Sequence, residues 1–365
     1  MKFTILQQDL LPSLQAVARS VGARSTLPVL DNILLSIEGQ RLKIAATNLE
    51  IGVVKFIPVK EAAEGEITVP AKTLVELISG LGQAKVTLES QGEVLTVSSG
   101  SFKASINGIA AAEFPVIPVS SGSDVSFPKE VFLSSAAVLF AAAVDEGRPV
   151  LTGILTEAKD SRLDFVATDG FRLAHKQVVL PKAPTEFKTL IPKRTYEEVL
   201  RIISEQAVGE IKIATSQNQN QVVFTLGETI VSSRLIEGQF PAWEKIIPAE
   251  IVGRALVEKE QLLQAIKLAA VFAKGDNVLV LTTKNKSLNL KSSAKEIGTQ
   301  ENEVEGNIEG DELQIAFNTR FLQDAVSNIP SVQLMIEFSG PLSAALIKPV
   351  GGEGLEYIVM PVRLS

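Results

Sequence analysis

The chain carries a loose threefold internal repeat with a period of roughly 120 to 126 residues. Each copy opens with apolar residues at helical spacing, continues into strand-rich sequence, has a second helical pattern directly after a strand, and closes with further strands. The opening helical patterns cover residues 10–21, 132–143 and 262–269, and the strands before the second helical patterns cover residues 67–70, 190–192 and 315–318. Helices and antiparallel hairpins mix within each copy without strict βαβ alternation, which predicts an α+β fold of three similar domains.

The length of the chain supports this division. At 365 residues it exceeds what one typical hydrophobic core accommodates. The repeat places boundaries near residues 120–124 and 249–254. We therefore expect an N-terminal domain over residues 1–121, a central domain over residues 125–249 and a C-terminal domain over residues 251–365.

Composition argues against several classes of protein. The chain has no cysteine, which excludes disulfides, thiolate metal sites and cysteine nucleophiles and fits a reducing cytoplasm. The first residues lack the pattern of a signal peptide, and no stretch reaches the roughly 18 apolar residues that span a bilayer. We therefore expect a cytoplasmic protein with no membrane partner. The net charge of −7 argues against a surface that is basic throughout, although it leaves room for a local basic face.

No catalytic motif is found in the sequence. His175 is the only histidine, so no histidine-based triad or multi-histidine metal site can form within the chain, and we expect a structural or surface role for it. The spacings of Walker loops, HExxH, GxSxG and EF-hands are absent. We expect no metal and no cofactor. The absence of these motifs argues against an enzyme without excluding one, because sequence alone cannot pair carboxylates into an acid/base couple.

One hairpin, at residues 166–173, differs from an ordinary turn. Asp-Gly between two apolar-alternating runs predicts a tight turn, because glycine adopts positive φ at little cost. Residues 45–50 echo this stretch about one domain earlier, but only the later copy continues with Phe171, Arg172 and Leu173. A large aromatic, an arginine and a leucine directly after a turn indicate that the hairpin does more than reverse the chain.

Basic residues recur on or beside the predicted helices. On any single helix they are best explained as a solvated face with local ion pairs, such as Glu197 with Arg201 at i,i+4 spacing. The interpretation changes if six domains close a ring with these helices inside. A domain of this size is about 35 Å across, so a six-membered ring leaves a hole of roughly 35 Å, which is wider than a duplex of about 20 Å. Two copies of the chain could then surround DNA and hold it by weak, mobile phosphate contacts.

Three segments together resemble the bacterial sliding clamps, the beta subunits of DNA polymerase III: residues 166–173, 237–241 and 357–364. The resemblance covers the whole chain. It implies a head-to-tail homodimeric ring of six clamp-type domains, with helices inside and sheets outside, that encircles duplex DNA regardless of sequence and has no catalytic activity or cofactor. It also implies a clamp loader that opens the ring, and it implies that the DNA polymerase III alpha subunit and other proteins with clamp-binding motifs dock on the outside.

The resemblance implies three sets of site residues. A pocket for short peptide motifs with apolar anchors, between the central and C-terminal domains, would comprise Leu151, Thr168, Gly170, Phe171, Arg172, Leu173, Pro241, Lys245, Ile246, Leu342, Met360, Pro361, Val362, Arg363 and Leu364. The DNA-facing residues would be Arg24, Lys72, Lys193, Arg194 and Arg201, and the ring seam would use Ile106, Val271 and Phe272. Arg172 and Arg363 could frame the pocket and bind peptide carbonyls or an acidic residue, while the aliphatic residues form an adaptable cleft.

The chain departs from the family pattern at three places. Phe171 stands where some members have histidine, which should make this wall of the pocket more apolar. Glu244 and Lys245 replace a more basic pair. Pro149 and Val150 stand where some members carry two tyrosines thought to touch DNA, so that contact is not carried over to this chain.

Two other functions remain open at this point. One is an enzyme on a triplicated α+β scaffold with a site near Asp169 and Arg172, and the other is a repeat-built interaction scaffold without a role on DNA. A clamp should be a dimer that stays on nicked circular DNA and slides off when the circle is cut. Retention that is indifferent to linearisation would count against encirclement.

Overall fold

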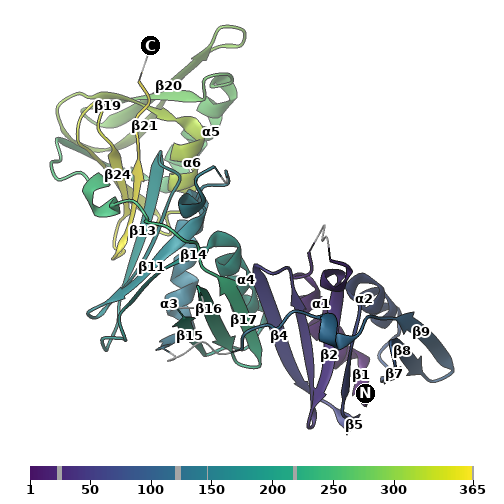
Figure 1. The fold of residues 1–365 in the computed structure, drawn as a ribbon. Coiled ribbons are helices and arrows are strands. Elements are labelled where there is room, and N and C mark those ends of the chain that lie inside the picture. The colour runs from purple at the N-terminus through teal and green to yellow at the C-terminus, as the bar shows by residue number, and fades with distance from the viewer. Residues whose placement is uncertain (23–26, 120–124, 146, 217–219, 364–365) are drawn as a thin grey trace. The chain divides into compact units, whose positions relative to one another are not determined.

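The computed structural model describes residues 1–365 except 23–26, 120–124, 146, 217–219 and 364–365 (Figure 1). The chain divides into two compact units. The first unit contains Met1–Leu133 and Arg194–Leu235, and the second unit contains Ser134–Lys193 and Ile236–Ser365. Among the described residues, no helix is long and apolar enough to cross a membrane.

A similar order of helices and strands occurs three times along the chain, with one additional strand, β5, in the first copy. The first copy is β1 (Lys2–Leu6), α1 (Gln7–Ala18), β2 (Asn32–Glu38), β3 (Arg41–Thr47), β4 (Ile51–Pro58), β5 (Lys60–Ala63), β6 (Gly65–Pro70), α2 (Ala71–Gly80), β7 (Lys85–Gln91), β8 (Val94–Ser99) and β9 (Phe102–Asn107). The middle copy is β10 (Val125–Pro128), α3 (Lys129–Leu133), β11 (Gly153–Lys159), β12 (Arg162–Thr168), β13 (Arg172–Val179), β14 (Phe187–Pro192), α4 (Lys193–Glu205), β15 (Glu210–Ser216), β16 (Gln221–Leu226) and β17 (Thr229–Arg234). The third copy is β18 (Gly253–Glu258), α5 (Lys259–Phe272), β19 (Val278–Lys284), β20 (Ser287–Ala294), β21 (Gly298–Gly310), β22 (Gln314–Asn318), α6 (Thr319–Ser327), β23 (Gln333–Phe338), β24 (Ala345–Pro349) and β25 (Leu355–Val359). The predicted threefold α+β fold is confirmed.

The first helix of the middle copy differs from the prediction. The pattern over residues 132–143 predicted one α-helix, but α3 is only 5 residues long and a 3₁₀ helix, η3 (Ser134–Ala141), follows it. Two carbonyls of η3 accept hydrogen bonds from strand side chains, one from the Tyr357 hydroxyl at 2.9 Å and one from Arg172 Nη2 at 2.9 Å. These donors satisfy the carbonyls from outside the helix, so α-helical i→i+4 bonds are not needed there.

The first unit contains two antiparallel sheets. The smaller has the strand order β5-β1-β7-β8-β9, and the larger has the order β10-β15-β16-β17-β4-β3-β2-β6. In the larger sheet, β17 from the middle copy pairs with β4 from the first copy, beginning where Ser233 lies opposite Ile51. Helix α1 packs against α2, β3 and β4 and buries Leu10, Leu14 and Val17. The first copy and half of the middle copy therefore share this unit.

The described residues of the second unit form one sheet of twelve strands in the order β14-β11-β12-β13-β25-β24-β23-β18-β21-β20-β19-β22. Here β13 from the middle copy pairs with β25 from the third copy, beginning where Arg172 lies opposite Val359. The junction has the same form as the one in the first unit. In both, the strand that follows a hairpin in one copy pairs with the last strand of another copy.

Aromatic rings anchor the part of the middle copy that lies in the first unit. Phe132 meets Phe127 and Phe224 edge to face, with ring centroids 5.9 Å apart in both pairs, and stacks on Tyr196 at 6.3 Å. All four rings are buried, and they come from β10, α3, α4 and β16. Removing a ring of this kind typically costs about 3–5 kcal/mol, so these contacts hold the four elements together.

Candidate partner-docking site

The hairpin between β12 and β13, which we call the Thr168 hairpin, is fixed by its own side chains. The Thr168 hydroxyl donates to the Arg172 carbonyl at 2.6 Å and accepts from the Gly170 N–H at 3.0 Å. Asp169 Oδ1 accepts from the backbone N–H groups of Phe171 and Arg172 at 2.9 and 3.0 Å. Gly170 has φ of +92°, which confirms why glycine is needed in the predicted turn.

Arg172 is locked inside the second unit, with only 9% of its surface exposed. Its Nε donates to Asp169 Oδ2 at 3.0 Å and its Nη1 donates to Asp324 Oδ2 at 2.5 Å, while Nη2 binds η3 as described above. The guanidinium also lies over the rings of Phe140 and Phe321, at 5.3 and 4.7 Å from their centroids. Each of the three guanidinium nitrogens therefore donates to an acceptor within the protein itself.

This arrangement corrects the expectation that Arg172 offers its guanidinium to a partner peptide. Successive side chains of a strand point to opposite faces of the sheet. Leu173 therefore faces an apolar cluster, whereas Arg172 faces η3 and α6 on the other side. Arg172 therefore stabilises the hairpin through contacts on the face of the sheet opposite the Leu173 side chain.

The apolar cluster on the Leu173 face, which we call the Leu173 cluster, contains two of the predicted pocket residues, Leu173 and Ile246. Its buried members are Leu155, Val166, Leu173, Leu190, Trp243, Ala344, Leu346 and Ile358, and Val150, Ile236, Phe240, Ile246 and Ile247 pack against it partly buried. Contributions come from the middle copy, from the segment after Phe240 and from the third copy. The cluster thus brings two of the predicted residues, Leu173 and Ile246, together.

Three predicted pocket residues are large, apolar and exposed. The exposed fraction is 59% for Phe171, 65% for Leu342 and 40% for Met360. Phe171 stacks on Phe321 with ring centroids 6.1 Å apart, and the Met360 N–H donates to the Phe171 carbonyl at 2.9 Å. The turn, helix α6 and the segment after β25 are joined in this way. Exposed apolar side chains of this size suit a binding surface.

The remaining predicted pocket residues are placed as follows. Leu151 is buried in a short 3₁₀ helix, Pro241 and Lys245 are exposed, and Pro361 and Val362 are half-buried against β22 through a bridge to Phe317 and a bond from the Val362 N–H to the Ala316 carbonyl. Arg363 is exposed, and Leu364 lies outside the described residues.

Most residues of the Leu173 cluster were absent from the predicted set, and two aromatic residues are the most informative of those missed. Trp243 is buried in the Leu173 cluster, and Phe321 lies between Phe171 and Arg172. Trp243 is the only tryptophan in the chain and lies between the predicted residues Pro241 and Lys245, which was a usable signal. Phe321 had no such signal, since its helical pattern explained it as a core residue.

His175 lies on β13 and is buried, as expected for a structural histidine. Its Nε2 lies 2.8 Å from Asp164 Oδ1 and its Nδ1 lies 2.9 Å from Glu356 Oε1. Its ring centroid is 4.3 Å from that of Trp243. Burial lowers the pKa of His175, but the hydrogen bonds to the two carboxylates outweigh burial and raise the pKa above its ordinary value.

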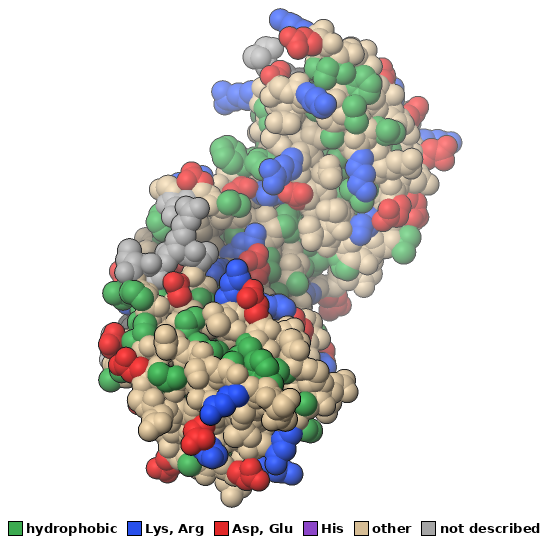
Figure 2. All heavy atoms as spheres, turned by 90° about the vertical axis from the view of Figure 1, so that its right-hand side faces the viewer, with side chains coloured by type: hydrophobic (Ala, Val, Ile, Leu, Met, Phe, Trp, Pro, Cys, Tyr) green, Lys and Arg blue, Asp and Glu red, His purple; other side chains and the backbone are tan. Residues whose placement is uncertain are grey.

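The basic residues predicted to face DNA do not share one environment. Arg201 pairs with Glu198 at 2.5 Å and also with Glu205, and these carboxylates raise its pKa. Lys72 is exposed and lies 3.9 Å from Glu76. On the face drawn in Figure 2, Lys and Arg side chains lie among Asp and Glu side chains. The local ion-pair interpretation therefore holds for Arg201, although its partners differ from the expected Glu197.

The other members of that predicted set and the seam residues are placed as follows. Lys193 and Arg194 begin α4, and Arg24 lies outside the described residues. Ile106 is buried within its own sheet, which leaves it little surface for a partner. On α5, Val271 is 51% exposed and Phe272, the last residue of the helix, is half-buried.

Comparisons with known proteins cover the whole chain. Three family models match it in order: the N-terminal domain of the DNA polymerase III beta subunit over residues 1–118, the central domain over residues 129–242 and the C-terminal domain over residues 244–363. The beta sliding clamps of Synechococcus elongatus and Pseudomonas aeruginosa are 33% and 32% identical to it, over 100% of both chains in each case.

Solved structures give the same result. The DnaN sliding clamp of Pseudomonas aeruginosa bound to griselimycin superposes with a TM-score of 0.94 and 30% identity, covering 100% of both chains. The beta subunit from Thermotoga maritima superposes with a TM-score of 0.91 and 27% identity over the same extent. The chain therefore belongs to the DNA polymerase III beta-subunit family, the beta sliding clamps, and is a DNA sliding clamp and processivity subunit that is not an enzyme.

Proposed function

We propose that two copies of the chain form a head-to-tail ring that encircles duplex DNA and tethers the replicative polymerase to it. The observation that carries this proposal is the end-to-end match of the threefold α+β fold to a solved sliding clamp, at a TM-score of 0.94. In such a ring the domains would span residues 1–121, 125–249 and 251–365. Because a ring holds DNA by topology, weak and mobile phosphate contacts suffice, and a net charge of −7 is compatible with sliding.

Tethering explains processivity without any catalysis by the clamp. A polymerase that lets go of the primer end stays attached to the ring, so rebinding is intramolecular and occurs at high effective concentration. We propose that the partners are the DNA polymerase III alpha subunit and other proteins with clamp-binding motifs, and that a clamp loader opens the ring. The chain would work in the cytoplasm, where bacterial DNA is replicated.

We propose that partner peptides dock on the Leu173 cluster and its exposed rim. Phe171, Leu342 and Met360 offer apolar side chains at the surface, and Leu173 and Ile246 contribute to the buried cluster. Apolar anchors in such a cleft supply most of the binding energy of a short peptide. Arg363 and Lys245 are both exposed and can offer a positive charge to an acidic residue of the peptide, whereas Arg172 is already paired with Asp169 and Asp324.

Of the proposed DNA-facing residues, we retain Lys72, Lys193 and Arg194, together with Arg24. Arg201 contributes less in this proposal because two carboxylates already neutralise it. Sequence-independent contacts of this kind position DNA and let it slide.

We propose that the ring seam joins two strand edges of opposite charge. Strand β9 is the edge of its sheet and carries exposed Lys103. On β21, residues 298–305 pair with β20 on one side only, within the part of the chain that the structure describes, and carry exposed Glu301 and Glu303. Edge strands pair readily with another chain, and Val271 on α5 adds exposed apolar surface. Lys103→Glu should lower the dimer fraction in sedimentation, and adding Glu301→Lys should restore it; unchanged dimers in both variants would place the seam elsewhere.

The test of encirclement uses nicked circular DNA. The chain, loaded onto the circle with a clamp loader, should be retained during gel filtration and should be lost when a restriction enzyme linearises the DNA. Deletion of residues 360–365 should abolish peptide docking while the dimer persists, because it removes Met360 from the rim. Retention on linear DNA without end blocks would overturn the topological mechanism, and unchanged peptide affinity in the deletion variant would overturn the docking site.

A further inference from the structure

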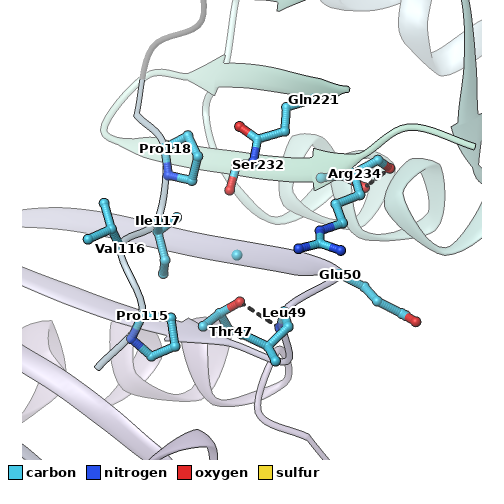
Figure 3. Close-up of a pocket in the computed structure, with 12 residues that line it drawn as sticks. Thr47, Leu49, Glu50, Pro115, Val116, Ile117, Pro118, Gln221, Ser232 and Arg234 are labelled. Carbon is cyan, nitrogen blue, oxygen red and sulfur yellow. Dashed lines mark hydrogen bonds between the residues drawn. The ribbon is translucent and has the colours of Figure 1, made fainter. Parts of the chain in front are cut away.

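A second pocket lies in the first unit, at the hairpin between β3 and β4, which we call the Thr47 hairpin (Figure 3). Its volume is about 230 Å³. It is lined by this hairpin, by the segment 115–118 and by strands β16 and β17, all of which belong to the first unit. The docking surface proposed above, around the Leu173 cluster, does not include this pocket.

The Thr47 hairpin has the same internal hydrogen bonds as the Thr168 hairpin. The Thr47 hydroxyl donates to the Ile51 carbonyl at 3.0 Å and accepts from the Leu49 N–H at 3.0 Å. Asn48 Oδ1 accepts from the N–H groups of Glu50 and Ile51 at 3.0 and 2.8 Å. Leu49, at φ of +75°, takes the position of Gly170. The two turns therefore match bond for bond.

The surroundings of the two hairpins correspond as well. Ala45, two residues before Thr47, lies in an apolar cluster with Phe114, just as Val166, two residues before Thr168, lies in the Leu173 cluster with Phe240 against it. A proline follows each of these phenylalanines. The residues after it lie beside the hairpin: residues 115–118 line the pocket in the first copy, and Trp243, Ile246 and Ile247 belong to or pack against the Leu173 cluster in the second. Strand β4 pairs with β17 as β13 pairs with β25. The pocket is thus the internal counterpart of the docking site.

One substitution between the copies shapes the pocket. Gly52 takes the position of Leu173, so no side chain projects from the strand at this point. A Cβ at position 52 would lie 2.7 Å from Ile117 Cγ2 and 3.0 Å from Ser232 Oγ. The glycine lets the segment 115–118 approach the strand closely. The resulting space is bounded by Pro115 and Ile117, and it can take an apolar side chain.

Polar groups in the pocket indicate what accompanies that side chain. Gln221 Oε1 is buried and accepts no hydrogen bond from the described residues. Arg234 is exposed, and no carboxylate of the described residues pairs with it. Figure 3 shows Gln221, Ser232 and Arg234 reaching the pocket from β16 and β17, with the carboxylate of Glu50 directed away from the Arg234 guanidinium. A buried acceptor without a donor is costly, and a ligand that supplies one would remove that cost.

We propose that this pocket binds a short, extended, acidic peptide segment of a partner protein. The peptide offers an apolar side chain to Pro115 and Ile117, a backbone N–H to Gln221 Oε1 and a carboxylate to the Arg234 guanidinium. The choice of an acidic peptide follows from charge complementarity with Arg234. The site goes beyond the docking surface around Leu173, because it lies in the other unit and is lined by different residues.

A second docking point on each chain has a physical consequence. A partner that engages the Leu173 cluster with one segment and this pocket with another would be held at two points. The second contact would then form at high effective concentration, so even a weak tripeptide contact would matter.

The test uses the full chain labelled at isoleucine methyl groups and observed by NMR, with the capped tripeptide acetyl-Ala-Val-Asp-amide as the probe. Titration should shift the Ile117 methyl resonance in a saturable way and leave that of Ile246, at the Leu173 cluster, in place. The matched peptide acetyl-Ala-Val-Asn-amide should bind about fivefold more weakly, because it lacks the charge. Arg234→Gln should lower the affinity for the acidic peptide by the same factor. Met360→Ala, at the Leu173 docking surface, should leave the affinity for the acidic peptide unchanged.

The possible results distinguish a wrong site from a wrong assignment of the ligand. Arg234 is exposed, so its substitution should leave the fold intact, which the unmoved methyl resonances of the second unit check. An Ile117 resonance that stays in place at millimolar peptide overturns the site. Equal affinity for the two peptides, or indifference to Arg234→Gln, overturns the assignment of an acidic ligand. None of these results depends on whether the ring encircles DNA.

Discussion

The Thr47 and Thr168 hairpins have the same backbone and different surroundings. In each, a threonine hydroxyl bridges the turn and an Asx side chain accepts two backbone N–H groups. The side chains that follow differ at matched positions: Ile51, Gly52 and Val54 in the first hairpin stand where Arg172, Leu173 and His175 stand in the second. The comparison teaches that the turn determines the backbone shape of the hairpin. The three differing residues on the strand after the turn, β4 or β13, determine what can bind beside the hairpin.

Arg172→Ala should give the largest effect on stability. The substitution leaves Asp324 and Asp169 without their cation, which costs about 3–5 kcal/mol of unfolding free energy. The matched variant is Ile51→Ala in the Thr47 hairpin, which removes buried apolar surface and leaves no carboxylate without its cation. Urea unfolding of Arg172→Ala, Asp324→Ala and the double variant measures the coupling, and the double variant should be more stable than the sum of the two single losses implies. Strictly additive losses would show that the ion pair does not hold the Thr168 hairpin.

Leu173→Ala and Gly52→Ala should both destabilise the chain, for opposite reasons. Leu173→Ala opens a cavity in the Leu173 cluster and should cost about 3 kcal/mol. Gly52→Ala crowds Ile117, with 2.7 Å between the new Cβ and Cγ2, and should cost about 1–2 kcal/mol. Adding Ile117→Ala should relieve the crowding in part. A neutral Gly52→Ala, again by urea unfolding, would mean that the segment 115–118 yields freely and does not shape the pocket.

Phe171→Ala should separate binding from stability. The ring is more than half exposed and stacks on Phe321, so its loss should cost at most about 1 kcal/mol of unfolding free energy. The affinity for a fluorescently labelled clamp-binding peptide should fall about tenfold, because an apolar anchor of the rim is lost. Glu50→Ala, at the matched position of the Thr47 hairpin, is the control and should change neither quantity. Unchanged peptide affinity in Phe171→Ala would remove Phe171 from the docking rim.

The sequence predicted those parts of the two hairpins that depend on local rules. Asp169 and Gly170 predicted the turn, and the echo at residues 45–50 predicted its repetition, because turn chemistry is encoded within a few residues. It did not predict that Arg172 is bound by Asp324, which lies 152 positions away. It also did not predict that η3 departs from α-helical form. Both features depend on strand pairings between copies of the repeat, and periodicity within one copy carries no information about them.

The smallest expected effect is a pH dependence confined to the Thr168 hairpin. Burial lowers the pKa of His175, but its bonds to Asp164 and Glu356 outweigh burial, so the pKa is raised in the folded chain. Its stabilising contribution is therefore fully present below the ordinary histidine pKa of about 6.5 and is lost as the pH rises through the raised value. The stability advantage of the wild type over His175→Gln should shrink between about pH 6 and pH 8. Val54→Ala, at the matched position, should differ from the wild type in stability by the same amount at every pH.

Fluorescence of Trp243, whose ring centroid is 4.3 Å from that of His175, offers a local readout. Parallel stability curves for the wild type and His175→Gln would show that the two carboxylates do not hold the proton on His175.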